Sequence, residues 1–170
     1  MDDDIYKTIA KPAEGIYKEK GSKFLAFAYP VISEEQIRTH LQDLKKQYYD
    51  ARHHCYAYRL SPDGSVWRAN DDGEPSSSAG KPILGQLLSM NLTEVVVFVI
   101  RYFGGIKLGV PGWIFAYRSA TADALANAEI IEKTNNDIFT VNFSYAVMND
   151  VMKLIKDEQP EIIEQNFDLS

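Results

Sequence analysis

The stretch EVVVFVIRYFGGIKLGVPGWIFAYRSATADALANA (Glu94–Ala128) decides the fold of this chain. Its beginning, Glu94 to Phe103, is apolar on both sides of a strand, which is typical of a central strand covered on both faces. Its end, Trp113 to Ala128, has the pattern of the longest helix. Between them, Arg101–Gly112 places four glycines, a lysine and a proline where a buried strand passes into a helix.

This junction allows two interpretations. The free N–H groups and positive dipole of a helix N-terminus attract anions, and glycine permits close backbone approach. Gly104, Gly105 and Gly109 would then offer backbone contacts, while Arg101 and Lys107 supply charge and Tyr102 lies beside them. Alternatively, the glycines serve only a tight strand-to-helix turn, and Arg101 pairs with an acid such as Asp72.

The residues before this stretch predict further strands and helices. Residues 13–20 and 23–31 alternate like two strands around a turn at Gly21-Ser22. Ser33 and Gln36 resemble a capping box for a helix over 34–49. The remaining predicted elements are strands over 53–60 and 66–70, a polar loop over 71–80 and a helix over 82–90.

The residues after this stretch predict a second, smaller domain. Residues 132–137 read as a linker, followed by a strand (138–146), a helix (about 149–158) and a strand (161–168). We therefore expect domains over 1–133 and 134–170. The second is a partial βαβ unit whose open strand edges would dock on the first domain or form a homo-oligomer.

Composition favours a soluble, cytoplasmic protein. The apolar fraction of 45% suits a globular core, the apolar runs are too short to span a membrane, and the acidic start MDDD does not resemble a signal peptide. Cys55 is the single cysteine, so no internal disulfide is expected.

The charges are unevenly distributed along the chain. The net charge is −6 overall, but residues 51–118 carry a net +2 and residues 119–170 a net −7. Five of the six arginines lie in the central segment. Arginine in a glycine-rich region suits recognition of phosphate or carboxylate, although these arginines could equally pair with local acids.

The triplet His53-His54-Cys55 is a candidate for metal binding or covalent catalysis. On a strand, His53 and Cys55 share one face and His54 points to the other. The spacing is not that of a zinc site, and a Cys–His dyad needs further groups. We expect one face of the triplet to pack in the core and His54 to line a cleft.

The segment DDGEPSSSAGKP (Asp71–Pro82) is a candidate binding loop. The carboxylates of Asp71, Asp72 and Glu74 could hold a divalent cation, perform acid–base chemistry or position nearby cations. The segment is neither an EF-hand nor a P-loop. The alternative is a solvated loop that caps the helix at Pro82.

Several aromatic residues could stack on nucleobases or could simply fill the core. They are Tyr56, Tyr58, Trp67, Tyr102 and Tyr117.

Four segments together resemble the YigZ/IMPACT family: GSKFLAFAYPV (Gly21–Val31), ARHHCYAYRL (Ala51–Leu60), DDGEPSSSAGKPIL (Asp71–Leu84) and VIRYFGGIKLGVPG (Val99–Gly112). The resemblance covers about residues 15–130. It implies an α+β protein whose first domain is a two-layer α/β sandwich of the ribosomal protein S5 domain 2-like type. It also implies a ferredoxin-like second domain similar to the last domain of elongation factor G, of which this chain has about half.

The chain departs from the family pattern in two places. Ser77-Ser78 stands where Gly-Thr is usual, and Phe115 stands where the family has an arginine. If that arginine binds phosphate, the site is weakened here, and Arg118 could partly substitute because it lies on a neighbouring part of the same helix face.

These observations favour a binding protein without a cofactor over an enzyme. We expect a cleft built from His53, His54, the acidic loop and the glycine-rich junction to bind RNA or a nucleotide-like anion. The resemblance implies a link to translation, through the ribosome or a translation-regulatory protein. The alternatives are a protein-interaction module in translational control and a metal-dependent hydrolase that uses Asp71, Asp72 or Glu74.

Overall fold

The computed structural model describes residues 4–135 and 148–158. The chain divides into two compact units, Met1–Asn136 and Asp137–Ser170. The predicted functional residues all belong to the first unit.

The first unit is built on a five-stranded antiparallel sheet with the strand order β2-β3-β6-β4-β5. The strands are β2 (Ala13–Glu19), β3 (Ser22–Pro30), β4 (His53–Leu60), β5 (Val66–Asn70) and β6 (Val95–Tyr102). Every residue of β6 from Val95 to Arg101 is buried. The prediction of a central strand covered on both faces is therefore confirmed.

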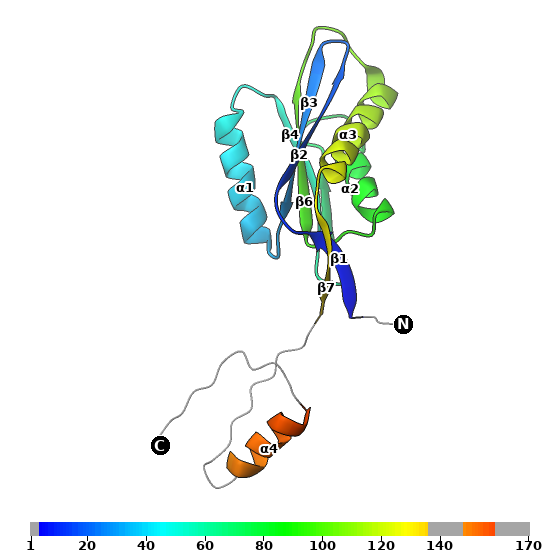
Figure 1. The fold of residues 1–170 in the computed structure, drawn as a ribbon. Coiled ribbons are helices and arrows are strands. Elements are labelled where there is room, and N and C mark those ends of the chain that lie inside the picture. Colours follow the sequence, from blue (N-terminus) through cyan, green and yellow to red (C-terminus); the bar gives the residue numbers. More distant parts are fainter. Residues whose placement is uncertain (1–3, 136–147, 159–170) are drawn as a thin grey trace. The chain divides into compact units, whose positions relative to one another are not determined.

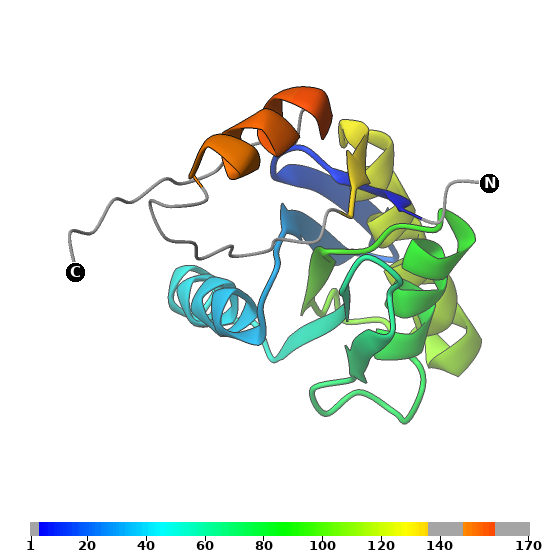
Figure 2. The ribbon, with the colours of Figure 1, turned by 90° about the horizontal axis from the view of Figure 1, so that it is seen from below.

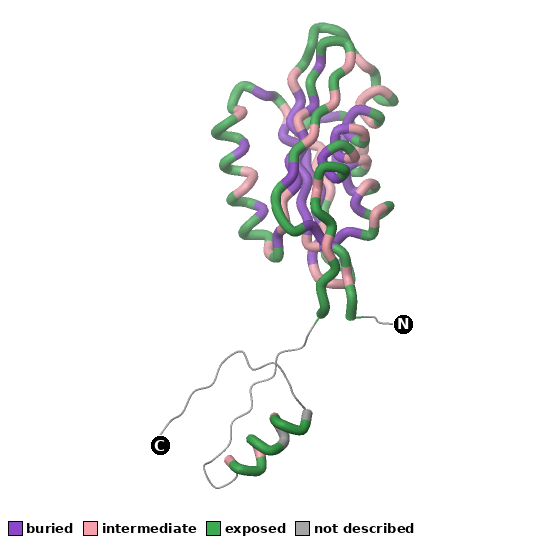
Figure 3. The backbone as a smooth tube through the Cα atoms, in the orientation of Figure 1, coloured by how far each residue is buried: buried purple, intermediate pink, exposed green. Residues whose placement is uncertain are grey.

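Helices cover both faces of this sheet (Figures 1 and 2). Helix α1 (Glu34–Gln47) packs on one face, while α2 (Gly80–Ser89) and α3 (Gly109–Ala126) pack on the other. The expectation of two layers was wrong, because the apolar residues of β3, β4 and β6 point to both faces and both must be shielded from water. Figure 3 shows the buried residues concentrated in the sheet and on the inner sides of the helices. The mixed α and β architecture is confirmed, whereas the S5 domain 2-like assignment stays a prediction.

Local sequence signals set several elements. In β3, Phe24, Ala26 and Ala28 join the core beneath α2 and α3, and Phe27 joins the core beneath α1, as their alternation predicts. The hairpin turn lies at Lys20-Gly21, one residue earlier than expected, with φ of 47° and 78°. Ser33 caps α1 by accepting a hydrogen bond from the Gln36 amide.

A two-stranded ribbon completes this unit. Strand β1 (Ile5–Ile9) pairs antiparallel with β7 (Ile130–Thr134), with Ile9 opposite Ile130. Residues 132–134 therefore belong to a strand and not to the linker that their polar sequence predicts. The ribbon is tied to the sheet by Thr93, whose amide donates to the Lys7 carbonyl at 3.0 Å.

The second unit contributes one described element, helix α4 (Met148–Glu158). It confirms the helix predicted at about 149–158. The predicted strands over 138–146 and 161–168 lie outside the described residues, so the ferredoxin-like assignment and pairing through their edges stay predictions. Within the residues that the structure describes, no helix is both long and apolar enough to span a membrane.

Candidate functional site

The glycine-rich junction leads directly into α3, which begins at Gly109 and not at Trp113 as predicted. Gly105 and Gly109 have positive φ angles of 91° and 75°, and a Cβ added to either would meet open space. The positive φ angles favour glycine at both positions, and the space beside each Cα is open.

Gly104 has a different role. A Cβ on this residue would lie 2.0 Å from the carbonyl carbon of Gly21, and its amide donates to Ser22 Oγ at 3.0 Å. The junction therefore packs against the β2–β3 hairpin, and Gly104 serves that packing. For Gly104, the interpretation that the glycines serve the structure of the turn is therefore correct.

Arg101, at the end of β6, meets the acidic loop. Its Nε–H donates to Glu74 Oε1 at 2.5 Å, and the Tyr117 hydroxyl donates to the same oxygen at 2.9 Å. The side chains of Glu74 and Arg101 are only 1% and 9% exposed. The two motifs thus meet as predicted, but through a buried ion pair, and the acid is Glu74, not Asp72.

The guanidinium of Arg101 also lies against the start of α3. Its central carbon is 5.4 Å from the ring centroid of Trp113. Within the described residues, no hydrogen bond is found for its terminal nitrogens, and the N-terminus of α3 has no side-chain cap. Lys107, just before this helix, is exposed. Positive charge and unsatisfied N–H donors therefore gather at this helix start.

The two histidines occupy opposite faces of β4, as the strand period predicts. His53 Nδ1 lies 2.7 Å from the Asp72 carbonyl oxygen, and Nε2 lies 3.6 Å from Glu74 Oε1. His54 is buried, with Nε2 3.0 Å from the Tyr48 carbonyl oxygen. The expectation that His54 lines a cleft was wrong, since its ring packs beside the core between the sheet and α1.

Asp71 organises the acidic loop. Its carboxylate accepts hydrogen bonds from the amides of Ser77, Ala79 and Gly80, at 2.9, 3.2 and 2.8 Å. It thereby caps α2, whose own N-cap residue, Ala79, has no side chain able to do so. The interpretation of the loop as a helix cap is therefore correct for Asp71, although the helix starts at Gly80, before Pro82.

The three carboxylates do not converge on a metal site. Asp72 Oδ2 accepts a hydrogen bond from the His54 amide at 2.7 Å, and Glu74 is paired with Arg101. Among residues 4–135 and 148–158, no group of three or more His, Cys, Asp or Glu side chains is arranged to hold a metal ion.

Cys55 and Tyr117 lie at the inner end of the same cluster. Cys55 Sγ is 3.1 Å from the Asp71 carbonyl oxygen and 3.4 Å from the Tyr117 hydroxyl. Burial raises the pKa of both the Cys55 thiol and the Tyr117 phenol well above their ordinary values. The thiol is thus held protonated, which is unlike an activated nucleophile.

The sequence predicts Tyr117 only as a stacking or core residue and does not predict its contact with Glu74. No local sequence pattern predicts this contact, because it forms only when α3 packs on the sheet and brings Tyr117 to the acidic loop. Tyr56, Tyr58 and Tyr117 are buried and belong to the core, whereas Trp67 is 60% exposed.

Tyr102 packs on the α1 face of the sheet, whereas Arg118 lies on α3, which covers the opposite face. The Tyr102 hydroxyl donates to Asp50 Oδ1 at 2.8 Å. Burial, with this carboxylate as the second cause, raises the pKa of Tyr102 to about 12. Arg118 is exposed, and its guanidinium carbon lies 5.6 Å from the ring centroid of Phe115.

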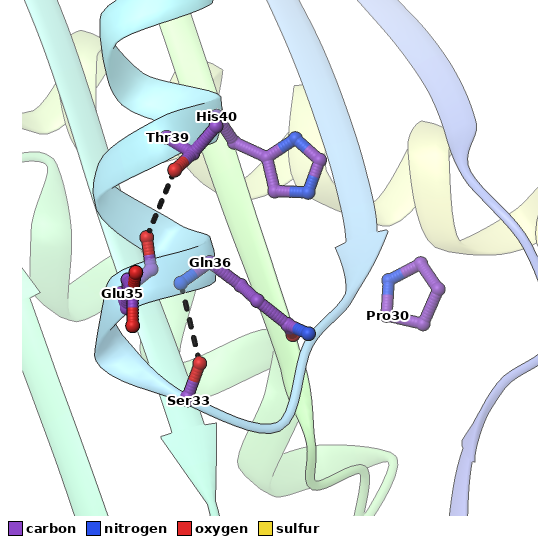
Figure 4. Close-up of a pocket in the computed structure, with 6 residues that line it drawn as sticks. All are labelled: Pro30, Ser33, Glu35, Gln36, Thr39 and His40. Carbon is purple, nitrogen blue, oxygen red and sulfur yellow. Dashed lines mark hydrogen bonds between the residues drawn. The ribbon is translucent and has the colours of Figure 1, made fainter.

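A separate polar pocket lies where β3 leads into α1, with a volume of about 440 Å³ (Figure 4). It is lined by Pro30, Ser33, Glu35, Gln36, Thr39 and His40. Ser33 and Thr39 already make hydrogen bonds within the first turns of α1. His40 stacks on Tyr29 with ring centroids 4.0 Å apart, and burial lowers its pKa. This pocket contains none of the predicted site residues.

Comparison with known proteins places this arrangement in a family. Residues 20–125 match the model of the Impact N-terminal domain. This match includes every residue of the predicted site. The chain belongs to the IMPACT family. It is 32% identical over 154 residues to the IMPACT family member YvyE of Bacillus subtilis, covering 91% of this chain and 71% of that protein.

Other members of the IMPACT family match at similar levels. The chain is 31% identical over 160 residues to the family member YigZ of Escherichia coli, covering 93% of this chain and 78% of that protein. A crystal structure described as that of a hypothetical protein superposes with a TM-score of 0.80 and 29% identity, covering 97% of this chain and 81% of that chain. The similarity therefore extends beyond the segment that carries the site.

Proposed function

We propose that this IMPACT family chain is a binding protein for an anionic ligand, either RNA or a nucleotide-like molecule, with a role linked to translation. The observation that carries the proposal is the position of Arg101 beside the uncapped start of α3. A cation close to a helix N-terminus makes a favourable environment for phosphate.

The residues of the proposed site have two different roles. Arg101 is buried and donates to Glu74 through Nε, and no hydrogen bond is found for its outer nitrogens among the described residues. Gly105, Lys107 and Gly109 form the exposed rim, where backbone amides and an ammonium group can approach a phosphate. Arg118 adds a second exposed cation on α3.

The link to translation rests on family membership, since the resemblance to eukaryotic IMPACT proteins implies translational control. A protein-interaction module is the second candidate. It is favoured by exposed apolar side chains near the same junction, namely Phe103, Ile106 and Val110. The metal-dependent hydrolase is not supported by a metal-binding cluster among residues 4–135 and 148–158.

The test is the salt dependence of binding to a fluorescent RNA oligonucleotide. Lys107→Ala is expected to weaken binding and to reduce the slope of log K against log salt by about 0.7–0.9 if one phosphate contact is lost. Lys11→Ala is the matched control, because Lys11 is an exposed lysine that precedes β2. Equal affinities and slopes for the two variants would contradict the proposal.

A further inference from the structure

Three segments meet at the end of the sheet where β6 finishes. They are the β2–β3 hairpin, the junction after β6 and the first turns of α3 (Figure 1). Gly104 contacts Ser22 of the hairpin, and Phe115 of α3 packs edge-on against Tyr17 of β2, with ring centroids 5.7 Å apart. We call this region the junction surface, and define it by Phe103, Ile106, Lys107, Phe115 and Arg118.

Large apolar side chains are exposed on the junction surface. Phe103, Ile106 and Phe115 are 55%, 54% and 48% exposed. Among the described residues, Phe103 has no aromatic or cation–π partner. Single exposed apolar residues are ordinary, but a group of them around one junction indicates an interaction site.

Two exposed cations accompany the aromatic rings of this surface. The Arg118 guanidinium carbon lies 5.6 Å from the ring centroid of Phe115. Lys107 is exposed and lies between Phe103 and Phe115 in sequence. The surface therefore complements a polyanion that also presents flat apolar faces.

We propose that the junction surface binds single-stranded RNA, with a base stacked on Phe103, a second base near Phe115, and phosphates at Lys107, Arg118 and the start of α3. This inference rests on the proposed function and specifies its ligand. Only an unpaired strand offers base faces to an aromatic side chain, because the bases of a duplex are stacked on one another. Interleaved aromatic and basic side chains are the general means of holding such a strand.

The experiment measures fluorescence anisotropy of the full chain with a labelled oligo(U) RNA and with its duplex with oligo(A), at several salt concentrations. The wild-type chain is expected to bind the single strand more tightly. Phe103→Ala is expected to lower this affinity about 5-fold to 150-fold, which is the range for losing one stacked base. Its salt slope is expected to stay unchanged, and Phe103→Trp is expected to keep the affinity.

Trp67→Ala is the matched control. Trp67 is about as exposed as Phe103. In the sheet, Trp67 of β5 lies opposite Arg59, at one end of β4, whereas His53 at the other end of β4 lies opposite Arg101, beside the junction. Trp67 is therefore distant from the junction surface. This variant is expected to bind RNA like the wild type. Since Phe103 and Trp67 are both exposed, thermal unfolding is expected to show both variants folded.

The outcomes separate this inference from the proposed function. If Phe103→Ala and Phe115→Ala bind the single strand like the wild type, or if the duplex binds as tightly, the single-strand inference is wrong. Salt-dependent binding that Lys107→Ala weakens would then still support an anion site. If the wild-type chain binds none of the RNAs, both proposals fail for RNA.

Discussion

Gly104 and Gly21 lie in backbone contact, so that a Cβ on Gly104 would come within 2.0 Å of the Gly21 carbonyl carbon. The contact joins the junction after β6 to the β2–β3 hairpin, and backbone atoms on both sides leave no flexible side chain to move away. The position of the junction surface therefore depends on the absence of a side chain at Gly104.

Gly104→Ala is accordingly expected to destabilise the first unit by about 1–3 kcal/mol, the range for forcing extra atoms into a packed region. Urea denaturation measures the free energy of unfolding. Gly85→Ala is the control, because Gly85 is an exposed α2 residue whose added Cβ would meet open space. It is expected to stabilise the chain by about 0.5–1 kcal/mol through helix propensity. Equal effects of the two substitutions would contradict the packing role.

The buried pair of Glu74 and Arg101 predicts strong coupling. Glu74→Ala leaves the guanidinium buried without its carboxylate and is expected to cost about 3–5 kcal/mol, and Arg101→Ala has the converse effect. The double variant is expected to lose less than the sum of the single variants, by about 1–3 kcal/mol. A double-mutant cycle from urea denaturation gives this number. Strict additivity would show that the contact contributes nothing to the folded state.

Asp71 is expected to act through stability and not through ligand binding. Asp71→Ala removes the acceptor for three loop and helix amides and is expected to cost about 1–3 kcal/mol. Amide hydrogen exchange at Ser77, Ala79 and Gly80 is expected to accelerate in this variant. Asp63→Ala serves for comparison, because its carboxylate accepts one amide hydrogen bond, from Ser65 in an exposed turn. A variant with unchanged stability and slow exchange would refute the capping role.

The β1–β7 ribbon predicts where the first unit can be shortened. A chain ending at Asn136 keeps β7 and is expected to unfold cooperatively like the first unit of the full chain. A chain ending at Glu129 leaves β1 without its partner and uncovers Ile9, which is buried in the core. Its melting temperature is expected to fall by about 4 °C for each kcal/mol lost, the value between those of smaller and larger domains. Identical melting of the two shortened chains would mean that the ribbon adds no stability.

The sequence by itself determined the elements that follow from local physics. Alternation along residues 23–31 predicts which face of β3 each side chain takes, and the apolar run after Glu94 predicts a central strand. The Ser33 cap and the β2–β3 hairpin were also visible, because a helix cap and a tight turn depend on residues only a few positions apart. The family motifs likewise marked the segments from which the candidate site is built.

Only the tertiary structure decided which of those residues meet and what each one does. Glu74 forms an ion pair with Arg101, and Asp71 caps α2, which begins nine residues later. Strand β1 pairs with β7, at the other end of the first unit in sequence. His54 is buried beside the core under α1, and helices cover both faces of the sheet. These outcomes depend on contacts between residues distant in sequence, whose energies are set by burial and packing that no local pattern records.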